Sequence, residues 1–305
     1  MKSTKYFDDF NVIQEGDNYS FVHVKIAEEN FYNILFNYFF SEDKMLGYIE
    51  NKESVNFLPT KKNYVKLYKN LKKFIDSENL DFEEERFYEE LKKYILIDNE
   101  DKESLLKFRK DKFGKIGEYI FSIILIKYFN MTSIIPKLTM VTDPNMSVFG
   151  IDVLFYNKDD KFLLFGESKF YNDLDDGINA LKKSLHSYEK QIEDEYLLVL
   201  SNTDNYNMPI IRENYISSIE ECYTFKEFIQ KEKIKNIGIP LFVLHGGKVD
   251  IDKILNSLNK IDKKVFFDLN TIYYCISLPI INKETFKIKF LEFIYERVKK
   301  YEEYK

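Results

Sequence analysis

Two acidic side chains and one lysine in a single short stretch are the residues of this chain best suited to carry chemistry. The stretch runs from Gly150 to Lys169 and contains Asp152 and Glu167. Its apolar residues alternate on both sides of a polar loop at 157–160, which predicts two antiparallel strands joined by a turn. Glu167 and Lys169 then share one face of the second strand, and Asp152 lies opposite them on the first. Burying such charges at the end of apolar strands is costly unless they bind something.

This combination suits metal-assisted hydrolysis of a phosphodiester. A hard divalent cation binds carboxylate oxygens and keeps waters available for a substrate phosphate, while a nearby lysine aligns or deprotonates the attacking water. The Glu-x-Lys spacing also recurs at Glu42, Glu50, Glu90, Glu100 and Glu303. The triplet alone is therefore weak evidence, but only Glu167 ends an apolar run and follows an aspartate on a preceding strand. The structural alternative is an ion pair between Glu167 and Lys169, with Asp152 capping a turn.

The strand that carries Asp152 is predicted to place Ile151, Val153 and Phe155 on the face opposite the acid. Asp143 competes with Asp152 as the acid at the strand end. We prefer Asp152, because an aspartate before a proline in a turn usually makes its own local hydrogen bonds.

The composition indicates a folded protein that does not bind nucleic acid by bulk charge. The chain has 305 residues, of which 45% are hydrophobic, enough for one large or two ordinary domains. Its 45 basic and 51 acidic residues give a net charge of −6, so any nucleic-acid binding needs a local basic patch, metal ions or a basic partner.

Several classes of protein do not fit the sequence. Cys222 and Cys275 are expected to be reduced core thiols, and the three histidines have no metal-ligand spacing. No Walker A loop or other motif for an organic cofactor is present. The charged first residues and the short apolar runs predict a cytoplasmic protein that does not span a membrane.

The first third of the chain, residues 1–108, is predicted to be a mainly helical module. A polar lead-in is expected over Met1–Asn18 and a strand over Tyr19–Ile26. Apolar residues at spacings of three and four then predict three helices. The first begins at Ala27, the second runs over about Lys61–Asp76 and the third over Phe82–Ile97.

Residues 109–305 are predicted to form a mixed sheet flanked by helices, an α+β or α/β arrangement. Besides the hairpin, the expected strands are Ile134–Val141, Glu195–Ser201, Ile237–Leu244 and Thr271–Ile281. The expected helices are an apolar one containing Gly114 to Ile126, one from Asn172 or Asp173 to about Lys190, one around Ile219–Glu232 and a terminal one over Lys283–Lys305.

Two groups of basic residues are candidates for contacts with a phosphate backbone. They are Lys107, Arg109, Lys110, Lys112 and Lys115, and, on the helix after the hairpin, Lys182 and Lys183. The alternative for the first group is a solvated helix face. Glu118 follows this group in apolar surroundings. A helix packed on the hairpin places Glu118 beside Asp152 as a further metal ligand, and the alternative is a helix-start acid that faces water.

Four short motifs resemble the PD-(D/E)xK nuclease superfamily. They are Gly-Glu-Tyr-Ile-Phe at Gly117, Phe-Gly-Ile-Asp at Phe149, Phe-Gly-Glu-Ser-Lys at Phe165 and Gly-Ile-x-x-x-x-x-Ser-Leu at Gly177. More narrowly they resemble the HamA family of nuclease subunits from Hachiman anti-phage defence, and the related AbpA abortive-infection proteins, over roughly the last two-thirds of the chain. The chain departs from the superfamily pattern in having Gly-Ile-Asp in place of Pro-Asp. It also lacks a clear Gln-x-x-x-Tyr after the lysine, which argues against the RecB and Cas4 branch.

The resemblance implies a restriction-endonuclease-like fold and a set of roles. Asp152 and Glu167 are implied to bind Mg²⁺ or Mn²⁺, Lys169 to be the catalytic lysine, and Glu118 to be the helix acid that joins the metal shell. DNA is the implied substrate, and a helicase-like ATPase, HamB, is the implied partner that restrains cleavage until infection. Two other functions stay open: an inactive nuclease-like scaffold that binds DNA or a partner, and an RNase on the same fold.

Overall fold

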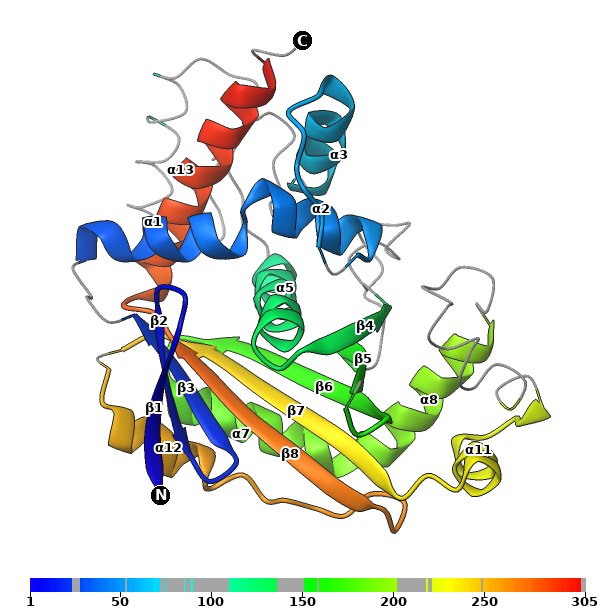
Figure 1. The fold of residues 1–305 in the computed structure, drawn as a ribbon. Helices are drawn as coiled ribbons and strands as arrows, with labels where there is room; N and C mark the ends of the chain where they lie inside the picture. Colours follow the sequence, from blue (N-terminus) through cyan, green and yellow to red (C-terminus); the bar gives the residue numbers. More distant parts are fainter. Residues whose placement is uncertain are drawn as a thin grey trace.

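The computed structural model has an eight-stranded mixed sheet at the centre of the fold (Figure 1). It describes residues 1–23, 28–52, 54–71, 74, 85, 89, 110–135, 151–157, 159–201, 218, 221–247 and 249–302. The strands are β1 (Lys2–Phe7), β2 (Phe10–Glu15), β3 (Asn18–His23), β4 (Met131–Ile135), β5 (Val153–Asn157), β6 (Phe162–Tyr171), β7 (Asn236–His245) and β8 (Asn270–Pro279). Their order across the sheet is β1-β2-β3-β8-β7-β6-β5-β4.

The centre of the sheet is parallel and both of its ends are antiparallel. Strands β3, β8, β7 and β6 run parallel to one another. The hairpin of β1 and β2 joins β3 at one end, and β5 and β4 follow β6 at the other. The predicted mixed sheet with helices is therefore confirmed. So is the predicted hairpin, as the antiparallel pair β5 and β6.

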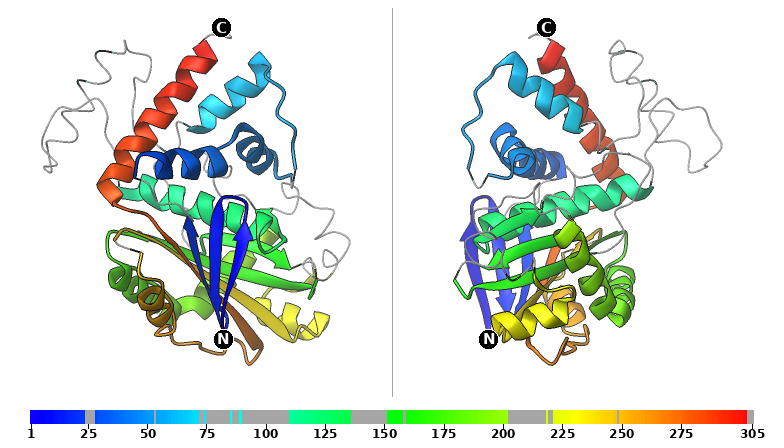
Figure 2. Two further views of the ribbon diagram at one scale, coloured as in Figure 1. Left: turned by 60° about the vertical axis from the view of Figure 1, so that its left-hand side comes forward. Right: turned by 90° about the vertical axis from the view of Figure 1, so that its right-hand side faces the viewer.

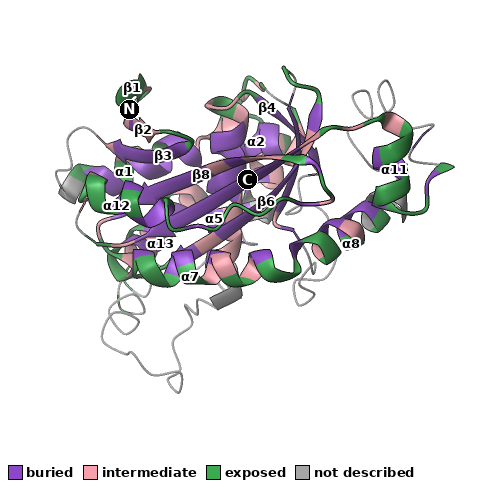
Figure 3. Ribbon diagram, turned by 90° about the horizontal axis from the view of Figure 1, so that it is seen from below, coloured by how far each residue is buried: buried purple, intermediate pink, exposed green. Residues whose placement is uncertain are grey.

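Helices cover both faces of this sheet (Figures 1 and 2). They are α1 (Glu28–Phe39), α2 (Glu42–Glu50), α3 (Lys61–Leu71), α5 (Lys110–Lys127), α7 (Leu174–Ser184), α8 (Tyr188–Ser201), α11 (Phe225–Glu232), α12 (Ile251–Leu258) and α13 (Lys283–Glu302). Helix α5 lies directly on one face, with α1, α2, α3 and α13 stacked beyond it. Helices α7 and α12 lie on the other face, and the central strands between the two layers are buried (Figure 3).

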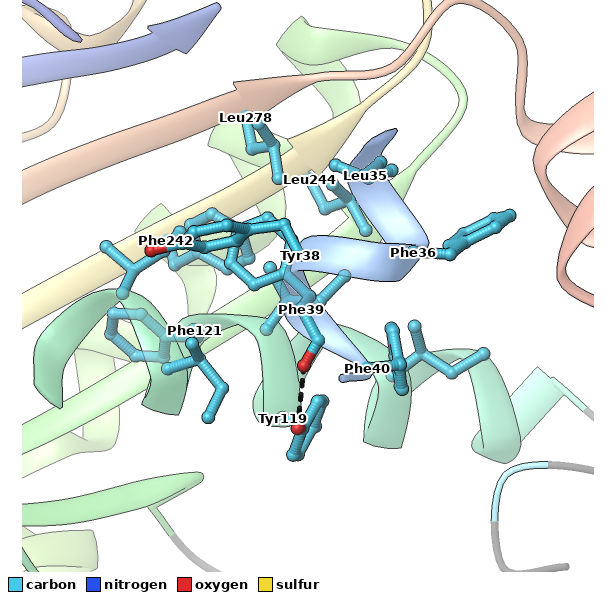
Figure 4. Close-up of a cluster of buried hydrophobic side chains, with 14 of the residues drawn as sticks. Leu35, Phe36, Tyr38, Phe39, Phe40, Tyr119, Phe121, Phe242, Leu244 and Leu278 are labelled. Carbon is cyan, nitrogen blue, oxygen red and sulfur yellow. Dashed lines mark hydrogen bonds between the residues drawn. The ribbon is translucent and has the colours of Figure 1, made fainter. Parts of the chain in front are cut away.

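Aromatic packing ties the amino-terminal helices to the sheet through α5 (Figure 4). The buried Tyr119 hydroxyl on α5 donates a hydrogen bond of 2.8 Å to the carbonyl of Phe39 on α1. Two residues further along α5, Phe121 stacks on Phe242 of β7, with ring centroids 5.2 Å apart. The front helices and the α5 side of the sheet therefore share one hydrophobic core. The predicted division at residue 108 falls outside the described residues and stays a prediction.

The prediction of a polar lead-in over Met1–Asn18 is wrong. These residues form β1 and β2 and the start of β3, so the first part of the chain extends the sheet. Strand β1 lies at the sheet edge with nearly all of its side chains exposed, which is why it carries no apolar alternation. In β2 the buried Phe10 and Val12 do alternate with less buried neighbours.

The prediction of a buried strand over Glu195–Ser201 is also wrong, since these residues belong to helix α8. A short apolar run does not distinguish a buried strand from a buried helix. The buried Tyr188, Ile192 and Tyr196 follow one another at intervals of four, the spacing of a helix face. The helix expected to run to about Lys190 ends instead at Ser184, because a 3-10 turn separates α7 from α8.

Most of the other expected elements are confirmed with small shifts of their ends. Strands β7 and β8 and helices α1, α3, α5, α11 and α13 lie where the apolar patterns placed them. Strand β4 begins three residues before the predicted Ile134. Of the helix expected at Phe82–Ile97 only Glu85 and Glu89 are described, and both are helical. Helix α12 was not predicted, although Asp250 caps its first turn by accepting from the Lys253 N–H at 3.1 Å.

Within the part of the chain that the structure describes, none of the helices has the length and apolar character that crossing a lipid bilayer requires.

Candidate active site

Asp152, Glu167 and Lys169 come together where β5 separates from β6. Strand β5 pairs with β6 only from Val153 onward, and the chain bends at Asp152. Gly166 allows the close approach there, since a Cβ at this position would lie 2.4 Å from Val153 Cγ2. Before the bend the predicted face assignment fails: Ile151 packs with Leu154, on the opposite side of the sheet from Val153.

The Asp152 carboxylate replaces the missing strand partner of β6. Its Oδ2 accepts the backbone N–H of Ser168 at 2.6 Å and the Ser168 hydroxyl at 3.1 Å. The Asp152 N–H donates to the Gly166 carbonyl at 3.0 Å. Two donors therefore hold one oxygen of this carboxylate at the edge of β6, which fixes the direction of the whole group.

Glu167 is a buried carboxylate with one oxygen bound and one oxygen without a partner. The residue is 5% exposed. Its Oε1 accepts from Lys169 Nζ and, at 3.0 Å, from the hydroxyl of Ser184 at the end of α7. Its Oε2 is buried and finds no hydrogen-bond partner among the described residues. A buried carboxylate oxygen in this state has the donor chemistry of a ligand for a hard divalent cation.

Burial and the neighbouring acid oppose ionisation of Glu167. Removal from water and the charge of Asp152 raise the pKa of Glu167 to about 7, although the Lys169 ammonium acts in the other direction. Burial alone would lower the pKa of Lys169, but the charges of Glu167 and Asp152 outweigh it and raise that pKa. Lys169 is therefore an ammonium at neutral pH, whereas the ionised form of Glu167 is disfavoured.

A second Glu-x-Lys triplet shows how much of this depends on context. Glu50 accepts from both Lys66 at 2.7 Å and Lys52 at 3.1 Å, in a partly exposed position on α2. Hydrogen bonds from these two lysines lower the pKa of Glu50, whereas the pKa of Glu167 is raised. The same spacing of residues thus gives an ordinary ion pair at Glu50 and, at Glu167, a carboxylate whose ionised form is disfavoured.

Glu118 lies on α5, which packs against the same stretch of β6 from the other face. The two elements are in contact at Gly117, where a Cβ would lie at an ordinary contact distance of 3.8 Å from the Ser168 hydroxyl oxygen that donates to Asp152. Glu118 is half-buried. No group of three histidine, cysteine, aspartate or glutamate side chains able to hold a metal occurs within the described ranges. The role of Glu118 as a third acid stays a prediction, and the competing Asp143 lies outside the described residues.

The structure places part of the predicted basic surface. Lys182 and Lys183 lie in the last turn of α7, directly before Ser184, with Lys183 exposed and Lys182 half-buried. Lys115 is half-buried on α5. Lys107 and Arg109 lie outside the described residues, and so do the side chains of Lys110 and Lys112, whose backbone begins α5. Their contact with DNA stays a prediction.

Comparison with known proteins adds one finding to this geometry. The family model of HamA matches residues 14–294, which is most of the 305-residue chain and includes every residue of the site. The chain belongs to the HamA family. HamA is a component of Hachiman anti-phage defence, so this membership places the chain in that defence system. No curated protein and no solved structure matches the chain.

Three residues of this HamA family member that contact the site were not predicted from its sequence. Ser168 donates twice to Asp152, and Ser184 donates to Glu167. Tyr188 is fully buried and reaches the site strand β6 by donating from its hydroxyl to the Phe165 carbonyl at 2.8 Å. Burial, and after it the charges of Glu167 and Asp152, raise the pKa of Tyr188. Both serines had a sequence signal: Ser168 lies between Glu167 and Lys169, and Ser184 is the serine of the Gly-Ile-x-x-x-x-x-Ser-Leu motif at Gly177.

Proposed function

We propose that this chain is the metal-dependent DNA endonuclease of a Hachiman-type defence system, with a site of the PD-(D/E)xK kind. The observation that carries the proposal is the convergence of Asp152, Glu167 and Lys169 at the point where β5 leaves β6, with one Glu167 oxygen buried and unpartnered among the described residues. A mixed sheet flanked by helices is compatible with a restriction-endonuclease-like fold. Membership of the HamA family supports the defence role.

The donor set suits Mg²⁺ or Mn²⁺. The Asp152 carboxylate, whose direction Ser168 fixes, and Oε2 of Glu167 would hold the cation, with Glu118 as the proposed further acid. When bound, such a cation lowers the pKa of a water and stabilises negative charge on the phosphate. Glu167 must give up its proton before it binds, because its pKa is about 7 in the metal-free protein.

The positive charge of Lys169 defines its proposed role in the site. Its pKa is raised by the two acids in the metal-free protein, so there the side chain is an ammonium that donates hydrogen bonds. Its side chain is 23% exposed, so part of it is accessible from solvent. Lys169 therefore orients the attacking water or a phosphate oxygen and offsets the charge that develops on the phosphate.

The substrate and the partner are proposed from the net charge of the chain and from its family. The net charge of −6 does not favour free binding of DNA, so the basic residues beside the site and a helicase-like ATPase of the HamB type are proposed to bring the DNA to it. The same partner is proposed to restrain cleavage until phage infection.

The decisive experiment is a digestion of DNA and RNA of the same sequence, side by side, by the chain together with the helicase-like ATPase of its defence system. We expect cleavage of DNA in Mg²⁺ or Mn²⁺ and none in the presence of a chelator. Cleavage of RNA alone would replace the substrate in this proposal. Intact DNA and RNA in every condition would instead favour an inactive scaffold, in which Glu167 and Lys169 are only an ion pair.

A further inference from the structure

Two lysines at the start of α13 lie beside the end of β6, outside both groups of basic residues considered so far. Lys283 donates from Nζ to the carbonyl of Phe170 at 3.2 Å. Both ammonium groups face the ring of Phe113 on α5, with Lys283 Nζ 5.7 Å and Lys287 Nζ 4.9 Å from its centroid. Lys283 also lies 4.8 Å from the ring centroid of Phe170. Two aromatic rings thus position two ammonium groups near the end of β6, the strand that carries Glu167 and Lys169.

The position of Lys283 relative to the acids follows from the geometry of β6. Ser168 directs its backbone N–H to Asp152, and residues two apart in a strand direct their backbone groups to the same edge. The Phe170 carbonyl therefore faces the edge on which Asp152 lies. Two residues of strand separate the two contacts by about 7 Å. This is comparable with the distance between neighbouring phosphates of a nucleic-acid strand.

The positive charges of Lys283 and Lys287 repel each other. Burial and the charge of Lys287 lower the pKa of Lys283, which Glu284 offsets only in part. Lys287 has an ion pair with Glu284 at 2.7 Å, and the Glu284 side chain is 58% exposed, so that carboxylate is largely in water. An anion placed between the two ammonium groups would relieve their repulsion. A phosphate diester has the charge and the acceptor oxygens to do so.

We propose that Lys283 and Lys287 form a phosphate subsite that binds the DNA backbone next to the scissile phosphate. This inference rests on the proposed function, because the scissile phosphate is placed by Asp152, Glu167 and Lys169. The Phe113 and Phe170 rings position the two ammonium groups, and the carbonyl of Phe170 fixes Lys283 to the strand that carries the catalytic residues. The subsite sets the register of the strand, so that the bond to be cleaved lies at the acids.

The test is DNA binding by the full-length chain with Lys283→Gln, Lys287→Gln or both, measured by fluorescence anisotropy in a chelator across a series of salt concentrations. We expect each lysine removed to weaken binding several-fold at low salt and to reduce the slope of log affinity against log salt by about 1. The matched control is Lys289→Gln on the same helix, because Lys289, like Lys287, is paired with a glutamate three residues away. Residues two apart do not share a face of a helix, so Lys289 does not face the side of α13 that carries Lys287, and the slope of this variant should not change.

Outcomes of this test separate the subsite from the proposed function. The subsite would be overturned if the salt dependence of binding were unchanged in Lys283→Gln, in Lys287→Gln and in the double variant. It would also be overturned if the unaltered chain showed no measurable binding. If the variants also cleave DNA normally while Glu167→Gln does not, the subsite is wrong and the nuclease stands. Lys287→Gln keeps the test valid if Lys283→Gln does not fold, because no contact of Lys287 with the backbone of β6 is among those that the described residues make.

Discussion

Replacing Glu167 by glutamine is expected to abolish DNA cleavage by the chain in its complex while leaving the fold intact. Glutamine keeps the size of the side chain and an oxygen for the Ser184 hydroxyl, but it removes the charge that the cation requires. The rate should fall on the order of 1,000-fold or more, which corresponds to at least about 4 kcal/mol of transition-state stabilisation. Cleavage assays and a thermal melt of the same preparation would measure both effects.

The matched control for this experiment is Glu50→Gln. Glu50 also belongs to a Glu-x-Lys triplet with an ion-paired lysine, but it lies on α2, away from β6. We expect Glu50→Gln to cleave DNA at the unaltered rate. Equal activity of Glu167→Gln and Glu50→Gln would show that the triplet on β6 is structural and would remove the assignment of the site.

The same substitution is expected to stabilise the metal-free protein at high pH. The pKa of Glu167 is raised from its ordinary value of 4.5 to about 7, so the folded state binds a proton more tightly than the unfolded state. Below the unfolded pKa both states are protonated and Glu167 has no effect on stability. As the pH rises through the window between 4.5 and about 7, the unfolded state loses the proton first and the free energy of unfolding falls.

Above this window the ionised Glu167 destabilises the fold by at most about 3 kcal/mol. Glu167→Gln removes this penalty, so in a chelator it should be more stable than the unaltered chain at about pH 8 and nearly equal to it at about pH 5. Glu50→Gln should have the opposite sign at about pH 8, because the lowered pKa of Glu50 marks a stabilising carboxylate. Urea unfolding at the two pH values measures both. A less stable Glu167→Gln at high pH would indicate a favourable structural ion pair.

The part of the site that sequence reasoning predicted is the part that depends on strand alternation. Because side chains alternate along a strand, Glu167 and Lys169 had to share a face of β6, and the polar loop at 157–160 had to return the chain antiparallel to β5. The hydrogen bond between Glu167 and Lys169 follows from that pattern alone. Their common neighbour Asp152 was predicted for the same reason.

The contacts that make the site unusual depend on where pairing stops, which alternation does not reveal. The Asp152 side chain bonds to the Ser168 N–H because the pairing of β5 with β6 begins only at Val153, one residue after Asp152. Ser184 reaches Glu167 because α7 ends after eleven residues, at a 3-10 turn that carries no clear sequence signal. Lys283 lies 113 residues away from Phe170 in the chain, and only the parallel pairing of β6, β7 and β8 brings them together.

The fold was harder to predict at its exposed edge than at its centre. The buried strands β7 and β8 are long apolar runs that end at turns, and they were predicted nearly to the residue. Strand β1 buries almost nothing, so hydrophobic patterning could not find it. Helix α8 was misassigned because Leu197 and its apolar neighbours form a run without visible periodicity, and Leu197 is in fact 47% exposed.

Binding of Mn²⁺ is the most direct measure of whether the acids of β5 and β6 form a metal site. The unaltered full-length chain should melt about 2–5 °C higher in saturating Mn²⁺ than in a chelator at about pH 8, because a ligand bound only by the folded state stabilises that state. Glu167→Gln should show no such shift. Equal melting of the unaltered chain with and without Mn²⁺, or an equal rise in Glu167→Gln, would contradict the metal site and with it the nuclease mechanism.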